Sequence, residues 1–221
     1  MDFPARIMPE LLLWPATALA ALWLAWAAWR MPRERLADNG FTHVLFGASV
    51  GVLILWSLHA GVPPVFNFHL LGVTALTLML GWHFASLAVA LVLIGITLNG
   101  QAEWASFGVN FLVMGGIPIA LTWRLLQLAQ RRLPHNFFIY VYVNAFLAAG
   151  LSILAAAGIG AGLLWLTGTQ TAAWLGHQYL PYFPLMFFSE AVLNGMVMTL
   201  MVALRPAWVC SFDDELYING K

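Results

Sequence analysis

The sequence has few charged residues. Asp, Glu, Lys and Arg make up 8% of its 221 positions, whereas 62% are hydrophobic. A soluble domain of this composition would expose apolar patches too large to stay dispersed. The formal net charge is zero and no basic cluster alternates with aromatic residues, which argues against nucleic-acid binding. The single cysteine, Cys210, excludes an internal disulfide and a multi-cysteine metal site.

The sequence also lacks the motifs of several enzyme classes. It contains no Walker motif, no nucleophile elbow and no His-Glu-x-x-His. These gaps argue against an ATPase, an esterase or a zinc protease, so we do not expect an enzyme. If the chain takes part in active transport, separate subunits must hydrolyse the ATP.

Long apolar stretches fill most of the chain. About 20 apolar residues suffice for a helix to cross a bilayer, and somewhat fewer suffice when the helix is buried among neighbours. We therefore expect an all-α polytopic membrane protein with one domain, residues 1–221, and about seven transmembrane helices. The predicted spans are about 11–29, 41–61, 66–82, 84–98, 107–130, 137–167 and 178–204.

The basic residues predict how these spans are oriented. Eight of the nine Lys and Arg residues fall into three groups, and seven spans place all three groups on one side. Basic loops stay on the cytoplasmic side of a membrane, so the N-terminus is predicted to be periplasmic and the C-terminus cytoplasmic. The groups are Arg30, Arg33 and Arg35; Arg124, Arg131 and Arg132; and Arg205 and Lys221.

With this orientation, several candidate metal ligands gather on the outer side. Imidazole, carboxylate and amine groups together suit nickel, cobalt, copper or zinc. The alternative is that histidines at span ends merely occupy the headgroup region. His69 is the strongest candidate because it begins a span directly after the Pro63-Pro64 turn. The polar groups predicted on the outer side are the amine of Met1, Asp2, His59, Asn67, His69, Asn99, Glu103 and His177.

Glu190 is predicted to lie within the hydrocarbon region, with Asn194 one helical turn further on. An unpaired carboxylate there costs several kcal/mol, so it demands an explanation. One interpretation is a polar path for a metal, formed by Glu190, Asn194 and Asn110. The other is a structural role, with Glu190 protonated or hydrogen-bonded to Asn110 or Asn144.

Short motifs spread along the chain resemble the substrate-binding membrane subunit of cobalt/nickel importers of the energy-coupling-factor ABC type. The closest similarity is to a divergent proteobacterial branch with a Phe-Asp-Asp-x-x-x-Tyr tail. No single motif identifies the family, but their order and spacing together match it. The matching segments are Met1–Pro4, His69-Leu70-Leu71-Gly72, Gly108-Val109-Asn110 with Met114-Gly115, Arg131-Arg132, the Ala/Gly-rich 145–162, Leu180-Pro181 with Glu190, and 212–217.

The resemblance implies a metal site. In that family the first amine, the second residue and the histidine of the His-Leu-x-Gly segment hold the ion. Here these are Met1, Asp2 and His69, with His59, Asn67 and His177 as additional or supporting candidates. The family has histidine where this chain has Asp2, so one imidazole is replaced by a harder oxygen ligand. Nickel or cobalt is the favoured bound substrate, with copper and zinc as alternatives.

The resemblance also implies the cellular setting. We expect a multi-pass protein of the bacterial inner membrane that captures a divalent metal ion at its periplasmic face. Its implied partners are a coupling transmembrane subunit, cytoplasmic ATPase subunits and the lipid bilayer. The alternatives are a membrane metal chaperone or assembly factor that does not transport, and a structural membrane protein.

Overall fold

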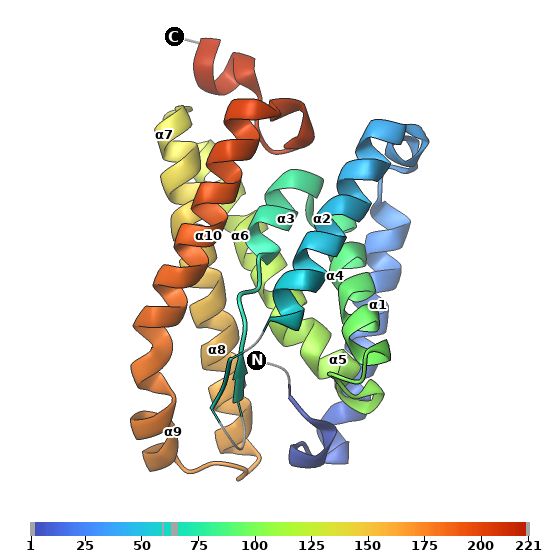
Figure 1. Cartoon of the computed structure of the whole chain (residues 1–221), viewed down its shortest axis with the longest axis vertical. Coiled ribbons are helices and arrows are strands. Elements are labelled where there is room, and N and C mark those ends of the chain that lie inside the picture. Colours follow the sequence, from blue (N-terminus) through green and yellow to red (C-terminus); the bar gives the residue numbers. More distant parts are fainter. Residues whose placement is uncertain (1–2, 59, 63–65, 220–221) are drawn as a thin grey trace.

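The computed structural model describes residues 3–58, 60–62 and 66–219, with no side-chain description at 60–62, 66–68 and 218–219 (Figure 1). Its elements form a bundle of helices. In chain order they are η1 Ala5–Ile7, α1 Glu10–Arg30, η2 Arg33–Ala37, α2 Asn39–Ser57, β1 Ala60–Val62, β2 Phe66–Phe68, α3 Val73–Leu80, α4 Trp82–Leu98, η3 Trp104–Ser106, α5 Phe107–Asn110, η4 Phe111–Gly116, α6 Ile117–Arg132, α7 Phe137–Ile139, η5 Tyr140–Leu147, α8 Ala148–Leu166, α9 Ala172–Gln178, η6 Leu180–Tyr182, α10 Phe183–Leu204, η7 Pro206–Trp208 and η8 Glu215–Asn219.

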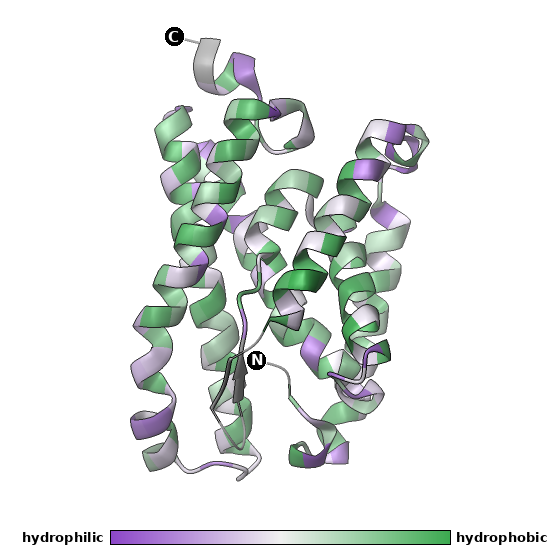
Figure 2. Ribbon diagram, viewed as in Figure 1, coloured by the Kyte–Doolittle hydropathy of each residue, from purple (hydrophilic) through white to green (hydrophobic). Residues whose placement is uncertain are grey.

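The predicted helical membrane fold is confirmed. Five helical segments are long and apolar enough to cross a bilayer, and the shorter α4 is also apolar. Many large apolar side chains point outward, including Leu11, Trp14 and Leu22 on α1. Such a surface is stable only in lipid. Figure 2 shows hydrophobic residues along the long helices and hydrophilic residues mostly toward the two ends.

The third predicted span, 66–82, is not one continuous helix. Its first part forms strand β2, which pairs antiparallel with β1, and α3 covers only eight residues. The second predicted span, 41–61, accordingly ends as a helix at Ser57. Apolar composition alone did not reveal that Gly72 and Gly81, which have positive φ, bound the short helix. Every residue of α3 is buried, so this helix lies inside the bundle instead of facing lipid.

The connection between the predicted spans 137–167 and 178–204 also differs from expectation. The segment 168–176 was predicted to be a loop, but it contains most of α9. The expectation that the basic groups share one side agrees with the fold. The η2 connection, the α6–α7 connection and the segment after α10 lie at one end of the bundle (Figure 1). We call this the basic end.

The segment after α10 packs back onto the bundle. The amides of Cys210 and Ser211 donate to the carbonyls of Met79 and Leu78, with N···O distances of 3.0 and 3.2 Å. These carbonyls lie in the last turn of α3, where carbonyl groups have no hydrogen-bond partner within the helix. The Ser211 hydroxyl also contacts the Tyr140 hydroxyl at 2.6 Å. The tail therefore caps α3 at the basic end.

Candidate functional site

The segment that begins at Phe3 is held inside the bundle by Asn110. The Phe3 amide donates to Asn110 Oδ1 at 2.7 Å, and Asn110 Nδ2 donates back to the Phe3 carbonyl at 3.3 Å. Asn110 Nδ2 also donates to Ser106 Oγ at 3.1 Å. Both Phe3 and Asn110 are buried. An asparagine side chain that satisfies both backbone groups of one residue fixes that residue as a neighbouring strand would.

Further contacts hold the same segment. The Phe3 ring fits against Gly160 of α8, where a Cβ atom would lie 2.7 Å from its Cζ. The Ala5 amide donates to Glu103 Oε2 at 2.8 Å. The Thr169 hydroxyl donates to the Ile7 carbonyl at 2.9 Å. Residues 3–8 are thus held by α8 and by the connections that follow α4 and α8, although they form only one short helical turn.

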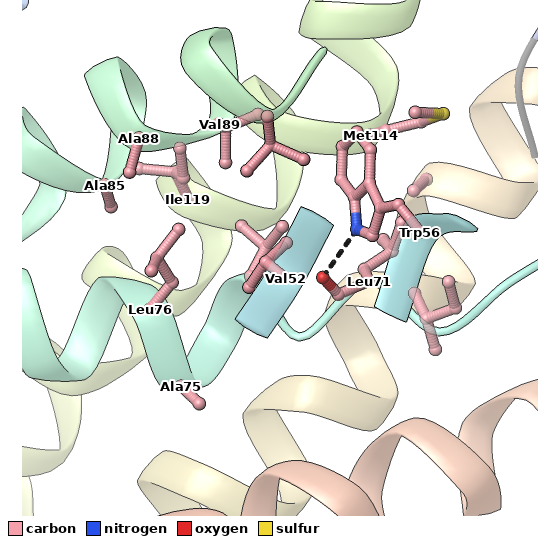
Figure 3. Packing of buried hydrophobic residues seen from close by; sticks show 14 of the residues in the cluster. Val52, Trp56, Leu71, Ala75, Leu76, Ala85, Ala88, Val89, Met114 and Ile119 are labelled. Carbon is pink, nitrogen blue, oxygen red and sulfur yellow. Dashed lines mark hydrogen bonds between the residues drawn. The ribbon is translucent and has the colours of Figure 1, made fainter. Parts of the chain in front are cut away.

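His69 lies in the non-helical segment between β2 and α3. Its ring is 5.1 Å from that of Trp56, measured between centroids. Trp56 is buried, and its indole Nε1 donates to the Leu71 carbonyl at 2.8 Å (Figure 3). Gly72 follows with φ of 65°, a conformation that residues with a side chain rarely adopt. Trp56 and Gly72 therefore set the path of the backbone that presents His69.

Glu190 holds the same segment from the other side. Its carboxylate accepts hydrogen bonds from the Leu71 amide at 2.8 Å and the Gly72 amide at 2.7 Å. Asn194 donates to Glu190 Oε1 at 2.9 Å and accepts from the Ala75 amide at 2.8 Å. The first amides of a helix have no partner within it, and here α10 supplies the acceptors.

These contacts assign Glu190 and Asn194 a structural role. Asn110 or Asn144 was the predicted hydrogen-bond partner of Glu190. This prediction was wrong, because Glu190 bonds to Asn194 and to the amides of Leu71 and Gly72. Glu190 and Asn194 are buried and hydrogen-bonded to the segment that carries His69. Asn110 is engaged with Phe3. Each of the three side chains thus bonds to backbone that it holds in place, and Asn110 and Asn194 also bond to the side chains of Ser106 and Glu190.

Residues of both anchored segments, Phe3 and Leu71, belong to the same buried apolar cluster. Figure 3 shows Trp56 and Leu71 packed near Met114, which lies about one helical turn beyond Asn110. Met114 is buried in the same apolar cluster.

The remaining predicted site residues are not brought together in the described structure. His177 is exposed on α9. Met1, Asp2 and His59 lie outside the described residues, and so does the side chain of Asn67. Among the residues that the structure describes, no three His, Cys, Asp or Glu side chains are close enough to hold a metal together. Of the predicted ligands Met1, Asp2 and His69, only His69 lies among the described residues.

Sequence reasoning missed two residues of this region. Trp56 was read only as part of an apolar span, and Glu103 only as an outer polar residue. A tryptophan near the end of a span is common, so no sequence signal distinguished it. Ser106, one turn before Asn110, offered a weak signal because small hydroxyl residues often pair with a buried amide.

The fold and these anchors define a class of protein. It is a polytopic membrane component in which buried side chains of the bundle hold the segment that begins at Phe3 and the non-helical segment that carries His69. Sites on irregular backbone at membrane depth are tolerated only where protein buries them or they line a cavity.

The chain belongs to the CbiM family. The family model, described as the cobalt uptake substrate-specific transmembrane region, matches residues 2–208. The chain is therefore a membrane component of metal uptake. No curated protein matches it.

Two solved structures share the fold. A truncated transition metal transporter is 20% identical with a TM-score of 0.77, covering 92% of this chain and 99% of its own. A transition metal transporter is 18% identical with a TM-score of 0.75, covering 92% and 93%. The shared fold therefore covers nearly the whole chain.

Proposed function

We propose that this protein is the substrate-binding membrane subunit of an energy-coupling-factor type ABC importer. It captures a divalent transition-metal ion, nickel or cobalt in preference to copper or zinc, at the periplasmic face of the inner membrane. A coupling transmembrane subunit and cytoplasmic ATPases supply the energy. The ligands are the amine of Met1, Asp2 and His69.

The double hydrogen bond between Phe3 and Asn110 is the observation that carries this proposal. Phe3 is a fixed point two residues from the first amine, and an extended chain spans at most about 3.3–3.6 Å per residue. The amine can therefore reach only a small volume around Phe3. We expect His69 to lie within reach of that volume, so that both nitrogens can approach one ion.

The chemistry of the ligands favours particular metals. An amine, a deprotonated amide and an imidazole suit square-planar nitrogen coordination, which Ni(II), Cu(II) and Co(II) can adopt. The carboxylate of Asp2 adds an oxygen ligand in place of an imidazole. We therefore expect weaker discrimination against zinc than an all-nitrogen site would give.

Metal analysis of the purified protein tests this function. The chain must keep its first residue free of any tag, because a tag would remove the proposed amine ligand. His69→Ala is expected to lower bound nickel or cobalt at least about tenfold, while His135→Ala retains it. His135 is the matched control, since it contacts Tyr217 of the tail with ring centroids 5.5 Å apart. Equal metal content in both variants would overturn the proposed site.

Uptake separates transport from metal chaperoning. Cells that express the chain with its ATPase partners are expected to accumulate radioactive nickel or cobalt only when the ATPase is active. Metal binding without ATPase-dependent uptake would instead identify a chaperone. Loss of both binding and uptake in His69→Ala would connect the site to the transport.

A further inference from the structure

A cavity of about 410 Å³ lies between α1, α4 and α6, away from the proposed metal site. Pockets of this size accommodate small polar ligands. Its lining is rich in tryptophan and contains one cation. The residues that matter here are Trp23, Trp26, Trp82, Trp123, Arg124 and Gln127.

The tryptophan rings pack against one another and form one wall of the cavity. The rings of Trp26 and Trp82 are 4.4 Å apart between centroids, and Trp23 meets Trp26 edge-on at 6.4 Å. The Trp23 indole is fixed by a 2.9 Å hydrogen bond to Ser86 Oγ. For Trp26, Trp82 and Trp123, no acceptor of the indole N–H lies among the described residues.

Arg124 supplies the charge. It is exposed and makes no ion pair within the described part of the chain. It lies two helical turns before Arg131, on a helix that ends at the basic end. A guanidinium beside lipid-facing apolar surface is costly unless an anion or water meets it. Gln127, one turn further along α6, adds an amide donor to the same cavity.

We propose that this cavity binds the phosphate-bearing headgroup of an anionic phospholipid from the leaflet at the basic end. The guanidinium pairs with the phosphate in a two-pronged geometry, and the indole N–H groups and Gln127 donate to the remaining oxygens. Tryptophan settles at headgroup depth, which places the wall where lipid phosphates lie. Basic pockets between transmembrane helices are known recognition sites for anionic headgroups. The acyl chains cover the exposed apolar faces of α1 beside it.

Lipid binding to the full chain in nanodiscs tests the proposal. The nanodiscs contain phosphatidylglycerol and phosphatidylcholine in equal amounts, and native mass spectrometry counts the lipids that remain bound. The unaltered chain is expected to retain phosphatidylglycerol preferentially. Arg124→Gln should lower that preference about fivefold, the effect of one basic residue on an anionic lipid. Arg131→Gln, which alters an arginine outside the cavity, should change it less.

Two further variants keep the test sharp. Arg124→Lys retains the charge but not the two-pronged geometry and should restore part of the preference. Trp123→Phe keeps the ring but removes an indole donor and should weaken retention without abolishing it. If Arg124→Gln fails to fold, the phosphatidylglycerol retained by Arg124→Lys, relative to the unaltered chain, still tests the proposal. Equal retention in all variants would overturn the proposal.

Competition identifies the source of the phosphate. Glycerol 3-phosphate and inorganic phosphate, added at millimolar concentration, should not displace the bound lipid if the acyl chains contribute. Displacement by either would show a site for a soluble phosphate and overturn the lipid assignment. Displacement only by an acidic peptide would identify a protein partner and would overturn it equally.

Discussion

The two anchors beneath the proposed metal site use different chemistry for the same purpose. Asn110 holds Phe3 with a neutral amide that both donates and accepts. Glu190 holds Leu71 and Gly72 with a carboxylate that only accepts and is supported by Asn194. A strand-like residue offers one donor and one acceptor, which an amide matches. The start of a helix offers donors only, which a carboxylate matches.

This comparison explains why Asn110 and Glu190 are buried in a largely apolar bundle. Each one replaces secondary structure that the local chain cannot form by itself. The Asn110 anchor orders a segment of six residues with a single short helical turn. The Glu190 anchor orders a loop and the eight-residue α3. Rigid ligands lower the entropy lost on metal binding, so both anchors should influence affinity without touching the ion.

The largest expected effect comes from removing the carboxylate. Glu190→Leu leaves the amides of Leu71 and Gly72 buried without acceptors, so we expect a loss of ~2–4 kcal/mol in unfolding free energy. Thermal unfolding in nanodiscs measures it. Glu190→Gln retains one acceptor and should lose less. If Glu190→Leu were as stable as the unaltered chain, the assigned anchoring role would be wrong.

The second comparison removes the amide. Asn110→Leu leaves the Phe3 amide without its acceptor, and we expect a loss of ~1–3 kcal/mol. Hydrogen exchange at the Phe3 amide should accelerate strongly, while exchange at Leu71 should change little. Acceleration at both amides to the same degree would mean that the anchors do not act separately.

The packing of Phe3 against α8 gives a smaller effect with an internal control. Gly160→Ala places a methyl group 2.7 Å from the Phe3 ring, so we expect a destabilisation of ~1–2 kcal/mol and weaker metal binding. Gly158→Ala lies on the same helix with nothing within 4 Å of the added Cβ. That variant should be neutral or slightly stabilised. Equal behaviour of the two variants would argue against the Phe3 contact.

The smallest loss of stability is expected from a substitution in the tail at the basic end. Ser211→Ala removes the hydroxyl bonds to Leu78 O, at 2.8 Å, and to Tyr140, and we expect a loss of ~1 kcal/mol. Metal affinity should remain unchanged because α3 keeps its Glu190 anchor. Calorimetric metal titration checks this. A large fall in affinity would show that the two ends of α3 are coupled.

Cys210 reports on the same tail through its reactivity. Burial raises the pKa of its thiol, an effect that the nearby Arg35 partly offsets. The side chain is exposed, so maleimide should reach it in the folded protein, but the raised pKa should shift the rise in labelling rate to more alkaline solution than in the unfolded chain. The same protein unfolded in detergent is the reference. Equal rates would show that the tail is not docked.

Part of this architecture could be predicted from sequence. The apolar runs predicted the long helices, because bilayer thickness sets their length. The grouping of arginines predicted which connections share an end. The hairpin and the short α3 could not be predicted, because residues 66–82 are apolar enough overall to suggest one span, and only Gly72 and Gly81 mark where α3 begins and ends.

The candidate site was predictable only in part. The intramembrane position of Glu190 signalled importance, but the sequence could not show that its partners are backbone amides 118 and 119 residues away. Asn110 was identified through a family motif, whereas its bond to Phe3 depends on the fold. Contacts with backbone leave no trace in side-chain identity, so sequence patterns cannot reveal them.

The central claim is that the first amine and His69 hold one metal ion. Nickel titration of two matched proteins tests it most directly: one with its natural first residue, and one with a single glycine placed before Met1. The extension moves the amine while leaving Phe3, Asn110 and His69 unchanged. We predict at least about a tenfold loss of affinity in the extended protein. Equal affinity would contradict the account, because the amine could not then be a ligand.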